Sequence, residues 1–203
     1  MGEIQVIPPA LKRLVRSFSS LPGIGAKTAT RLALTILRKP AADAREMAAA
    51  LTELHSSIRL CSQCMAFSET DPCNVCGDLR RDGSLVCVVE QPADLMAIEK
   101  TDQYRGHYHI LHGVLSPVDG IGPGELKVKE LISRINSGCI KEVLIATSST
   151  VPGEATASYL IDTLSRFPIK LTRLACGIPM GMDIKYADQH TLARAIESRS
   201  DAT

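Results

Sequence analysis

The stretch CSQCMAFSETDPCNVC, residues 61–76, divides the sequence into two halves with different patterns. It carries two C-x2-C pairs, Cys61 with Cys64 and Cys73 with Cys76, and eight residues separate the pairs. The residues before it show helical periodicity throughout, whereas those from about 85 onward alternate short β-branched runs with helical ones. The sequence therefore predicts two regions of different fold class that meet at a cysteine-rich loop.

The four cysteines have the spacing of a structural zinc site. Each C-x2-C pair lets two thiolates converge on one ion, and four thiolates complete a tetrahedral Zn2+ site with no open position for water. Reduced thiols or two disulfides are the alternative, and disulfides are disfavoured because the N-terminus lacks a secretory signal and a cytoplasmic protein is expected. We therefore expect one structural Zn2+ per chain. The remaining cysteines, expected as small apolar core residues, are Cys87, Cys139 and Cys176.

Three helices are predicted on the N-terminal side of the cysteines. They cover residues 9–18, a second segment that ends at Pro40, and a third from about 43 to 60. Each has apolar residues at helical spacing, so each should turn one stripe toward the interior. These stripes are Leu11, Leu14, Val15 and Phe18, then Ala29, Leu32, Ala33, Ile36 and Leu37, and finally Met47, Leu51, Leu54 and Ile58.

The segment LPGIGAKTATRLA, residues 21–33, joins the first two helices. A Walker phosphate loop needs a contiguous Gly-Lys-Ser/Thr after a strand, so a nucleotide-binding loop is excluded. The segment instead resembles the helix-hairpin-helix motif of DNA-binding proteins, in which glycines such as Gly23 and Gly25 let the backbone approach a phosphate. Lys27 and Arg31 lie one turn apart and would contact the DNA backbone without sequence specificity. A tight turn that only joins two helices is the alternative.

The distribution of charge favours the DNA interpretation. The net charge is only +1, but residues 1–50 hold 8 Lys+Arg and 3 Asp+Glu, whereas residues 51–203 hold 15 and 19. Between Pro8 and Pro40 there are seven basic residues and no acidic one. A solvated helix face would also carry such a block, but beside the glycine turn it indicates a surface for phosphates.

Two glutamates follow strand-like runs on the C-terminal side. Glu90 ends the run VCVVE, and Glu154 lies in the loop ATSSTVPGEATA after a later run. Loops at the carboxyl ends of strands collect ligands in open α/β sheets, and these two acidic loops resemble the Toprim domain of topoisomerases and primases. That domain adds an Asp-x-Asp pair that holds Mg2+, but Ser148 and Thr150 stand at those positions here. Hydroxyls cannot replace two carboxylates as anionic ligands, so we expect no tightly bound catalytic Mg2+.

The segment HYHILH offers a different hypothesis, a metal or acid-base site made by His107, His109 and His112. Alternation along a strand would place the first two on one face. No nearby cysteine or carboxylate pair completes a ligand set, so we expect surface or loop histidines.

The order of helix-hairpin-helix, four-cysteine site and Toprim-like domain is similar to that of the RecR family of bacterial recombination mediators. The resemblance covers essentially the whole chain and includes YHILHGVLSPVDGIGPGEL, GEATASYL and YADQHTLARAI. The chain departs from the family's usual pattern at two places. Ser148-Ser149 and Pro152 stand where Asn-Pro and Glu are usual, and Met182 stands where Gly is usual.

The resemblance implies a multidomain protein of α+β and α/β type. We expect a non-enzymatic repair factor that binds single- or double-stranded DNA, forms a homotetrameric ring, and acts with RecO and RecF to load RecA at single-stranded gaps. The alternative is a Mg2+-dependent Toprim nuclease or topoisomerase-like enzyme with Glu90 and Glu154 as ligands. The expected regions are a helix-hairpin-helix region at 1–58, a zinc finger at 59–80, a Toprim-like domain with a mostly parallel sheet at 81–178, and a helical C-terminal segment for oligomer contacts at 179–203.

Overall fold

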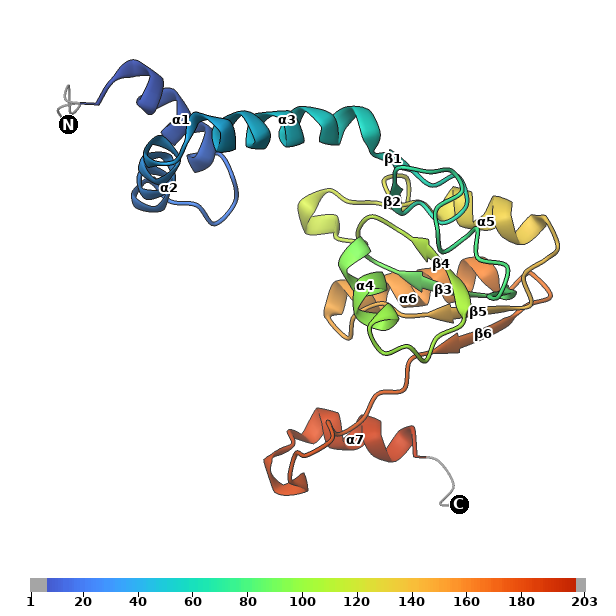
Figure 1. Cartoon of the computed structure of the whole chain (residues 1–203). Coiled ribbons are helices and arrows are strands. Elements are labelled where there is room, and N and C mark those ends of the chain that lie inside the picture. Colours follow the sequence, from blue (N-terminus) through green and yellow to red (C-terminus); the bar gives the residue numbers. More distant parts are fainter. Residues whose placement is uncertain (1–6, 200–203) are drawn as a thin grey trace. The chain divides into compact units, whose positions relative to one another are not determined.

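The computed structural model of the chain describes residues 7–199 and contains two compact units that divide between Ile58 and Arg59 (Figure 1). The outermost parts of the expected 1–58 and 179–203 regions lie outside the described residues. Within the described part of the chain, no helix combines the length and apolar character needed to cross a membrane. The division between the units lies directly before the cysteine-rich loop.

The first unit consists of three helices. α1 and α2 pack against each other, and α2 buries Ala29 and Ala33 completely. Prolines set the helix ends, because Pro9 begins α1 and Pro40 precedes α3, where a fixed φ and a missing N–H are tolerated. The periodicity therefore located all three helices. Their bounds are Pro9–Ser19 for α1, Ala26–Arg38 for α2 and Ala41–Ser57 for α3.

The apolar stripe of α3 is not covered within the described chain, and the expectation that it faces the interior is wrong. Met47, Leu51 and Leu54 are 41%, 59% and 55% exposed, and α3 has no buried residue. Leu37, at the end of α2, is 70% exposed. Periodicity records which face of a helix avoids water, but it does not say which molecule covers that face.

The second unit contains a small antiparallel ribbon and a four-stranded parallel sheet. The sheet has the strand order β4-β3-β5-β6, and all of its strand pairs are parallel. The predicted alternation of strands and helices is confirmed. The elements are β1 Arg59–Leu60, β2 Phe67–Ser68, β3 Asp82–Val89, α4 Pro92–Glu99, β4 Gly106–Ile110, a 3-10 helix Pro117–Asp119, α5 Val128–Asn136, β5 Glu142–Ile145, α6 Val151–Leu164 and β6 Lys170–Arg173.

Both faces of the sheet are covered, as the central strand β3 shows. Val86 and Val88 pack in one apolar cluster with residues of α5 and α6. Cys87 and Val89 point the other way, into a second cluster with α4 and the cysteine-rich loop. A parallel strand covered on both faces reads as a continuous apolar run, which is why VCVV lacks polar alternation. The unit is a layered α/β domain (Figure 1).

Three outward backbone groups of the edge strand β4 are satisfied without a further strand. Two carbonyl groups accept hydrogen bonds from arginine side chains, and one amide donates to the cysteine-rich loop. Parallel strands leave such groups unpaired at a sheet edge unless something else bonds them. The bonds run from Arg81 Nη1 to Gly106 O at 3.1 Å, from Arg134 Nη1 to Tyr108 O at 2.6 Å, and from Ile110 N to Cys64 O at 2.9 Å.

The C-terminal part of the second unit exposes apolar side chains. After β6 the chain forms a 3-10 helix, Ile184–Tyr186, and then α7, Gln189–Glu197. Neither helix has a fully buried residue. The exposed apolar residues in this part are Leu174, Met180, Met182, Ile184, Tyr186 and Ile196.

Candidate metal centre and nucleic-acid interface

The four predicted cysteines come together in one buried cluster. Cys61, Cys64, Cys73 and Cys76 are all buried, and their sulfur atoms lie within 4.8 Å of one another. The sulfurs of Cys64 and Cys73 are 3.5 Å apart. Zn–S bonds of about 2.3 Å place sulfurs about 3.8 Å apart at the corners of a tetrahedron, so the spacing suits a zinc ion. Four soft ligands fill every position of such a site.

The electrostatics of the cluster also favour a cation. The Cys76 thiol can donate a hydrogen bond to the sulfur of Cys64, and this lowers the pKa of Cys64 to about 5. The same hydrogen bond raises the pKa of Cys76 because it holds the proton on that sulfur, and burial and the nearby charge of Cys64 raise it further. A divalent ion at the centre would remove that conflict and let all four thiols deprotonate. Among the described residues, this is the single cluster with metal-ligand spacing.

Three hydrogen bonds fasten the cysteine-rich loop to β4, to the segment after it and to α5. The Ile110 amide donates to Cys64 O, and the ring Nε2 of His112 donates to Met65 O at 2.6 Å. Arg134 on α5 reaches Gln63 O at 3.4 Å. The first knuckle therefore depends on the sheet for its position, and the edge of the sheet depends on the knuckle. Zinc at this site would order both.

The two glycines of the turn between α1 and α2 have different roles, and only the first has a backbone conformation that favours glycine. Gly23 has φ +79°, a left-handed value that disfavours other residues. Gly25 has φ −77°, which any residue adopts, and a Cβ there would meet nothing within 4 Å. Gly25 is therefore not required by the turn, and its missing side chain leaves the start of α2 open to a partner.

The start of α2 offers unsatisfied donors and positive charge. Its N-cap, Gly25, supplies no side-chain cap, and no acidic residue lies in the first turn. The first hydrogen bond across the cap runs from Ala29 N to Gly25 O, so the preceding amides have no such carbonyl partner. Lys27 and Arg31 are both exposed on this helix. Free amides, the positive end of the helix dipole and two cations together suit a phosphate.

Glu90, the first Toprim-like acidic residue, holds a loop in place. Its Oε1 accepts a hydrogen bond from the Ser148 amide at 2.6 Å. A Cβ at Gly153 would lie 2.9 Å from the same oxygen and closer still to Ser148, so only glycine fits there. The hydroxyls of Ser148 and Thr150, at the positions of the missing aspartates, lie 2.7 Å from each other. These contacts organise the loop internally.

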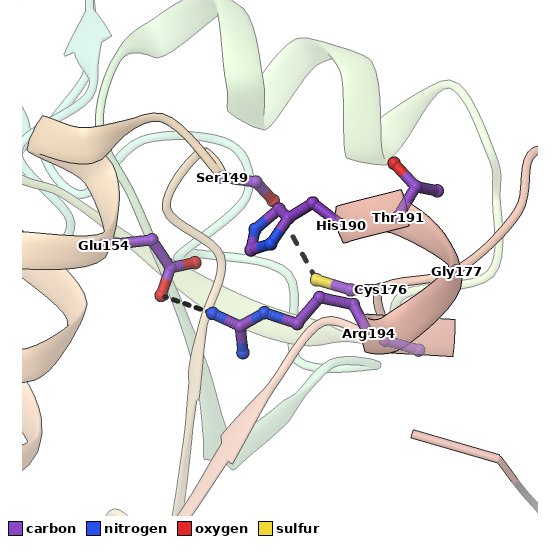
Figure 2. A pocket seen from close by; sticks show the side chains of 8 residues that line it. Ser149, Glu154, Cys176, Gly177, His190, Thr191 and Arg194 are labelled. Atoms are coloured by element: carbon purple, nitrogen blue, oxygen red, sulfur yellow. Dashed lines mark hydrogen bonds and ion pairs between the residues drawn. The ribbon is translucent and has the colours of Figure 1, made fainter. Parts of the chain in front are cut away.

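Glu154, the second acidic residue, is engaged by arginines. Arg173 donates to both of its carboxylate oxygens, and Arg194 of α7 lies 3.9 Å from one of them. The bond from Arg173 is the main reason that the pKa of Glu154 is lowered. Figure 2 shows Glu154 and Arg194 pointing toward each other across a pocket of about 340 Å3 that Cys176 and His190 also line. Sequence reasoning found Glu154 but missed Arg173.

The histidines of HYHILH do not gather into a metal site within the described chain, and the expectation of surface positions is wrong for His109. His109 is fully buried and its Nε2 donates to Lys127 O at 2.7 Å. His107 accepts from Arg134 at 3.2 Å, and His112 bonds the cysteine-rich loop. Each ring thus joins β4 or the loop after it to a different segment.

The other cysteines divide between core and surface. Cys87 is buried in β3, as expected, and burial raises its pKa to about 12. Cys139 is exposed and Cys176 is half-buried, so the core assignment is wrong for these two. Both lie outside the strand and helix runs that build the core, and this position in the sequence could have indicated that they are not core residues.

Three family models match successive parts of the sequence. A RecR helix-hairpin-helix model matches residues 11–55, a Toprim domain model matches residues 84–175, and a RecR C-terminal model matches residues 177–200. Their order is the order of the hairpin, the parallel sheet and the segment that contains α7.

Proteins named Recombination protein RecR are similar to this chain over nearly its whole length. The protein from Moorella thermoacetica is 50% identical over 194 residues, which cover 96% of this chain and 98% of that protein. The protein from Syntrophotalea carbinolica is 50% identical over 193 residues, 95% of this chain and 97% of that protein. The protein from Myxococcus xanthus is 47% identical over 194 residues, 96% and 98% of the two chains.

Proposed function

Because the chain belongs to the RecR family of recombination proteins, we propose that it is a non-enzymatic mediator of recombinational DNA repair that grips DNA through the α1–α2 hairpin. The observation that carries the proposal is the uncapped start of α2, where open amides lie beside the exposed Lys27 and Arg31. Gly23 and Gly25 set the approach of the backbone. The ligand is the phosphate backbone of single- or double-stranded DNA, without sequence specificity.

The cysteine cluster serves this function as a structural Zn2+ site with one ion per chain. Its four thiolates leave no coordination position for water or substrate, so the ion would order the loop and activate nothing. When bound, the ion would cross-link the two C-x2-C pairs.

Oligomerisation would bring several DNA-binding hairpins together. The exposed stripe of α3 and the apolar C-terminal part are two separate surfaces that need covering. If each pairs with the same surface of another copy, two different two-fold contacts close a ring with an even number of subunits, of which a tetramer is the smallest. The resulting multivalency offsets the weak binding of one small basic segment.

The partners of the protein in repair are proposed from the family resemblance. In this proposal the ring acts in the cytoplasm with RecO and RecF and helps to load RecA at single-stranded gaps. The expected regions at 1–58, 59–80, 81–178 and 179–203 then supply DNA binding, the zinc staple, the Toprim-like scaffold and subunit contacts.

The alternative, a Mg2+-dependent Toprim enzyme, has less support. Glu90 is bonded to the Ser148 amide, and both oxygens of Glu154 accept from Arg173. Ser148 and Thr150 supply hydroxyls in place of a carboxylate pair. A catalytic Mg2+ would need hard anionic ligands that these residues do not provide.

Salt titration of DNA binding tests the hairpin assignment. The double variant Lys27→Ala, Arg31→Ala should bind a fluorescent duplex more weakly, and its log–log salt slope should be shallower by about 0.9 per lost phosphate contact. The matched control is Lys129→Ala, Lys141→Ala in the second unit, which removes the same charge. If the hairpin variant has the solution mass, affinity and salt slope of the unmodified protein, the hairpin does not bind DNA and only joins α1 to α2.

A further inference from the structure

We propose that the phosphate-binding surface continues from the hairpin along α2 to Arg38, so that a DNA strand lies along the side of this helix. The proposal rests on the proposed function, because it extends the hairpin site by one further cation. It differs from a contact made only by the start of α2, in which Arg38 would lie far from the nucleic acid.

The spacing of the cations on α2 places them on one face. An α-helix turns about 100° per residue, so Arg31 lies about 40° and Arg38 about 20° around the axis from Lys27. All three side chains are exposed. The rise of about 1.5 Å per residue puts Lys27 and Arg38 about 16 Å apart along the helix. That length matches about five nucleotides of one strand of a duplex at about 3.4 Å each.

The surroundings leave this row of charges available. Among the described residues, no hydrogen bond or ion pair engages the side chain of Lys27, Arg31 or Arg38. The first acidic residue after α2 is Asp43, and it pairs with Lys39 at 3.9 Å. The three cations of the row therefore have no acidic partner within the described chain, whereas the neighbouring Lys39 has one in Asp43. A row of unpaired cations that extends a phosphate site is suited to bind further phosphates of the same strand.

The helix dipole offers a competing explanation for Arg38. This residue lies in the last turn of α2, where a positive charge stabilises the negative end of the helix. That role concerns only the folded protein, so it predicts a change in thermal stability and none in the salt dependence of DNA binding. The two explanations can therefore be separated by measurement.

The experiment compares Arg38→Gln with Lys39→Gln in the full-length, assembled protein. Both variants lose one positive charge, at adjacent positions. The probe is a fluorescein-labelled oligonucleotide of mixed sequence, used as single strand and as duplex over a salt series. For Arg38→Gln we expect a duplex slope shallower by about 0.9 per engaged subunit, which corresponds to about eightfold weaker binding at 0.1 M salt if the curves meet at 1 M. Lys39→Gln should match the unmodified protein, and Arg38→Lys should retain the slope.

Each outcome decides between the hypotheses. If Arg38→Gln and Lys39→Gln behave alike, either with no loss or with an equal loss, the extended surface is wrong. If this occurs while the double variant at Lys27 and Arg31 loses binding, the hairpin function stands and only the extension fails. If that double variant keeps full binding, the proposed function fails and the extension falls with it. A thermal melt and a solution mass for every variant exclude misfolding as the cause.

Discussion

The guanidinium of Arg173 donates one hydrogen bond to each carboxylate oxygen of Glu154, at 2.9 and 2.7 Å. Arg173 ends β6 and Glu154 lies in the first turn of α6, so the pair ties a strand end to a helix start. A bidentate pair of this kind uses the lone pairs that would otherwise face a metal ion. In this Toprim-like domain Glu154 therefore makes a structural ion pair.

The Arg173–Glu154 pair should contribute modestly to stability. Because the side chains are each 32% exposed, we expect Glu154→Gln to cost about 1 kcal/mol at pH 7. The pKa of Glu154 is lowered in the folded protein, so the contribution is fully present above the ordinary glutamate pKa and is lost as the pH falls from there through the lowered pKa of the folded state. Urea unfolding at pH 7 and pH 4 measures this. Glu69→Gln, in the exposed part of the cysteine-rich loop, is the control, and an equal cost in both variants would contradict the prediction.

We expect the purified protein not to nick, relax or synthesise DNA. The positions that would complete a Mg2+ site carry Ser148 and Thr150, and Glu90 is bonded to the backbone. Supercoiled plasmid incubated with Mg2+ or Mn2+ should stay supercoiled on a gel. Nicking that vanishes in Glu90→Gln would establish the enzymatic alternative.

Metal content should be one Zn2+ per chain, held by the four buried cysteines. Cys64→Ala should lose the ion and lower the melting temperature before it affects DNA binding, because a structural site contributes folding free energy. Cys139→Ala, an exposed cysteine outside the cluster, should retain both metal and stability. Elemental analysis and a thermal melt provide the two measurements. Less than about half a zinc per chain in the unmodified protein would count against the site.

Acid should destabilise the protein through His109. Burial lowers the pKa of this ring to about 4, with the charge of Arg134 acting in the same direction. The unfolded chain takes up a proton below about pH 6.5 while the folded chain does not, so stability falls as pH drops from about 6.5 to 4. The loss amounts to about 3 kcal/mol over that window.

The variant His109→Gln keeps an N–H donor for Lys127 O but cannot titrate, so its stability should vary less over the same pH range. His55→Gln, on the exposed surface of α3, should keep the full dependence. Chemical denaturation at several pH values measures both, and parallel curves for the two variants would remove His109 as the cause.

The exposed stripe of α3 should be a subunit contact. Leu51→Asp places a charge in that stripe and should shift the mass in solution toward smaller species, because a charge is costly in an apolar interface. Thr52→Asp puts the same charge on another face of the helix and should leave the mass unchanged. Light scattering at matched concentrations gives both values. Identical masses for the two variants would place the contact elsewhere.

Local chemistry made much of this molecule predictable from sequence. The cysteine spacing located a cluster whose sulfurs converge, because four soft ligands in two knuckles have few other arrangements. The glycine turn was predictable because Gly23 occupies a left-handed conformation. The alternation of short β-branched runs with helical ones predicted a mostly parallel sheet, and the four-stranded sheet is parallel throughout.

The rest depends on partners that lie far away in the chain. Arg173 is 19 residues from Glu154, and no periodic pattern links them. His109 is polar in sequence but buried, and only its Nε2 finds a partner, the carbonyl group of Lys127, while its Nδ1 has no hydrogen bond among the described residues. The stripe of α3 has the pattern of a core face, yet its cover is missing from the described chain. Sequence periodicity gives the faces of elements, but not what each face contacts.

The bond from the Ile110 amide to Cys64 O has a consequence for solubility. β4 lies at the margin of the sheet, and the cysteine-rich loop covers one of its outward amides. Loss of the ion would free that amide beside the two carbonyl groups that Arg81 and Arg134 still bond, and the freed donor could pair with the same margin of another molecule. Metal depletion should then produce fibrous or amorphous aggregates before the helices melt. The ion in this proposal protects the chain from self-templated misassembly.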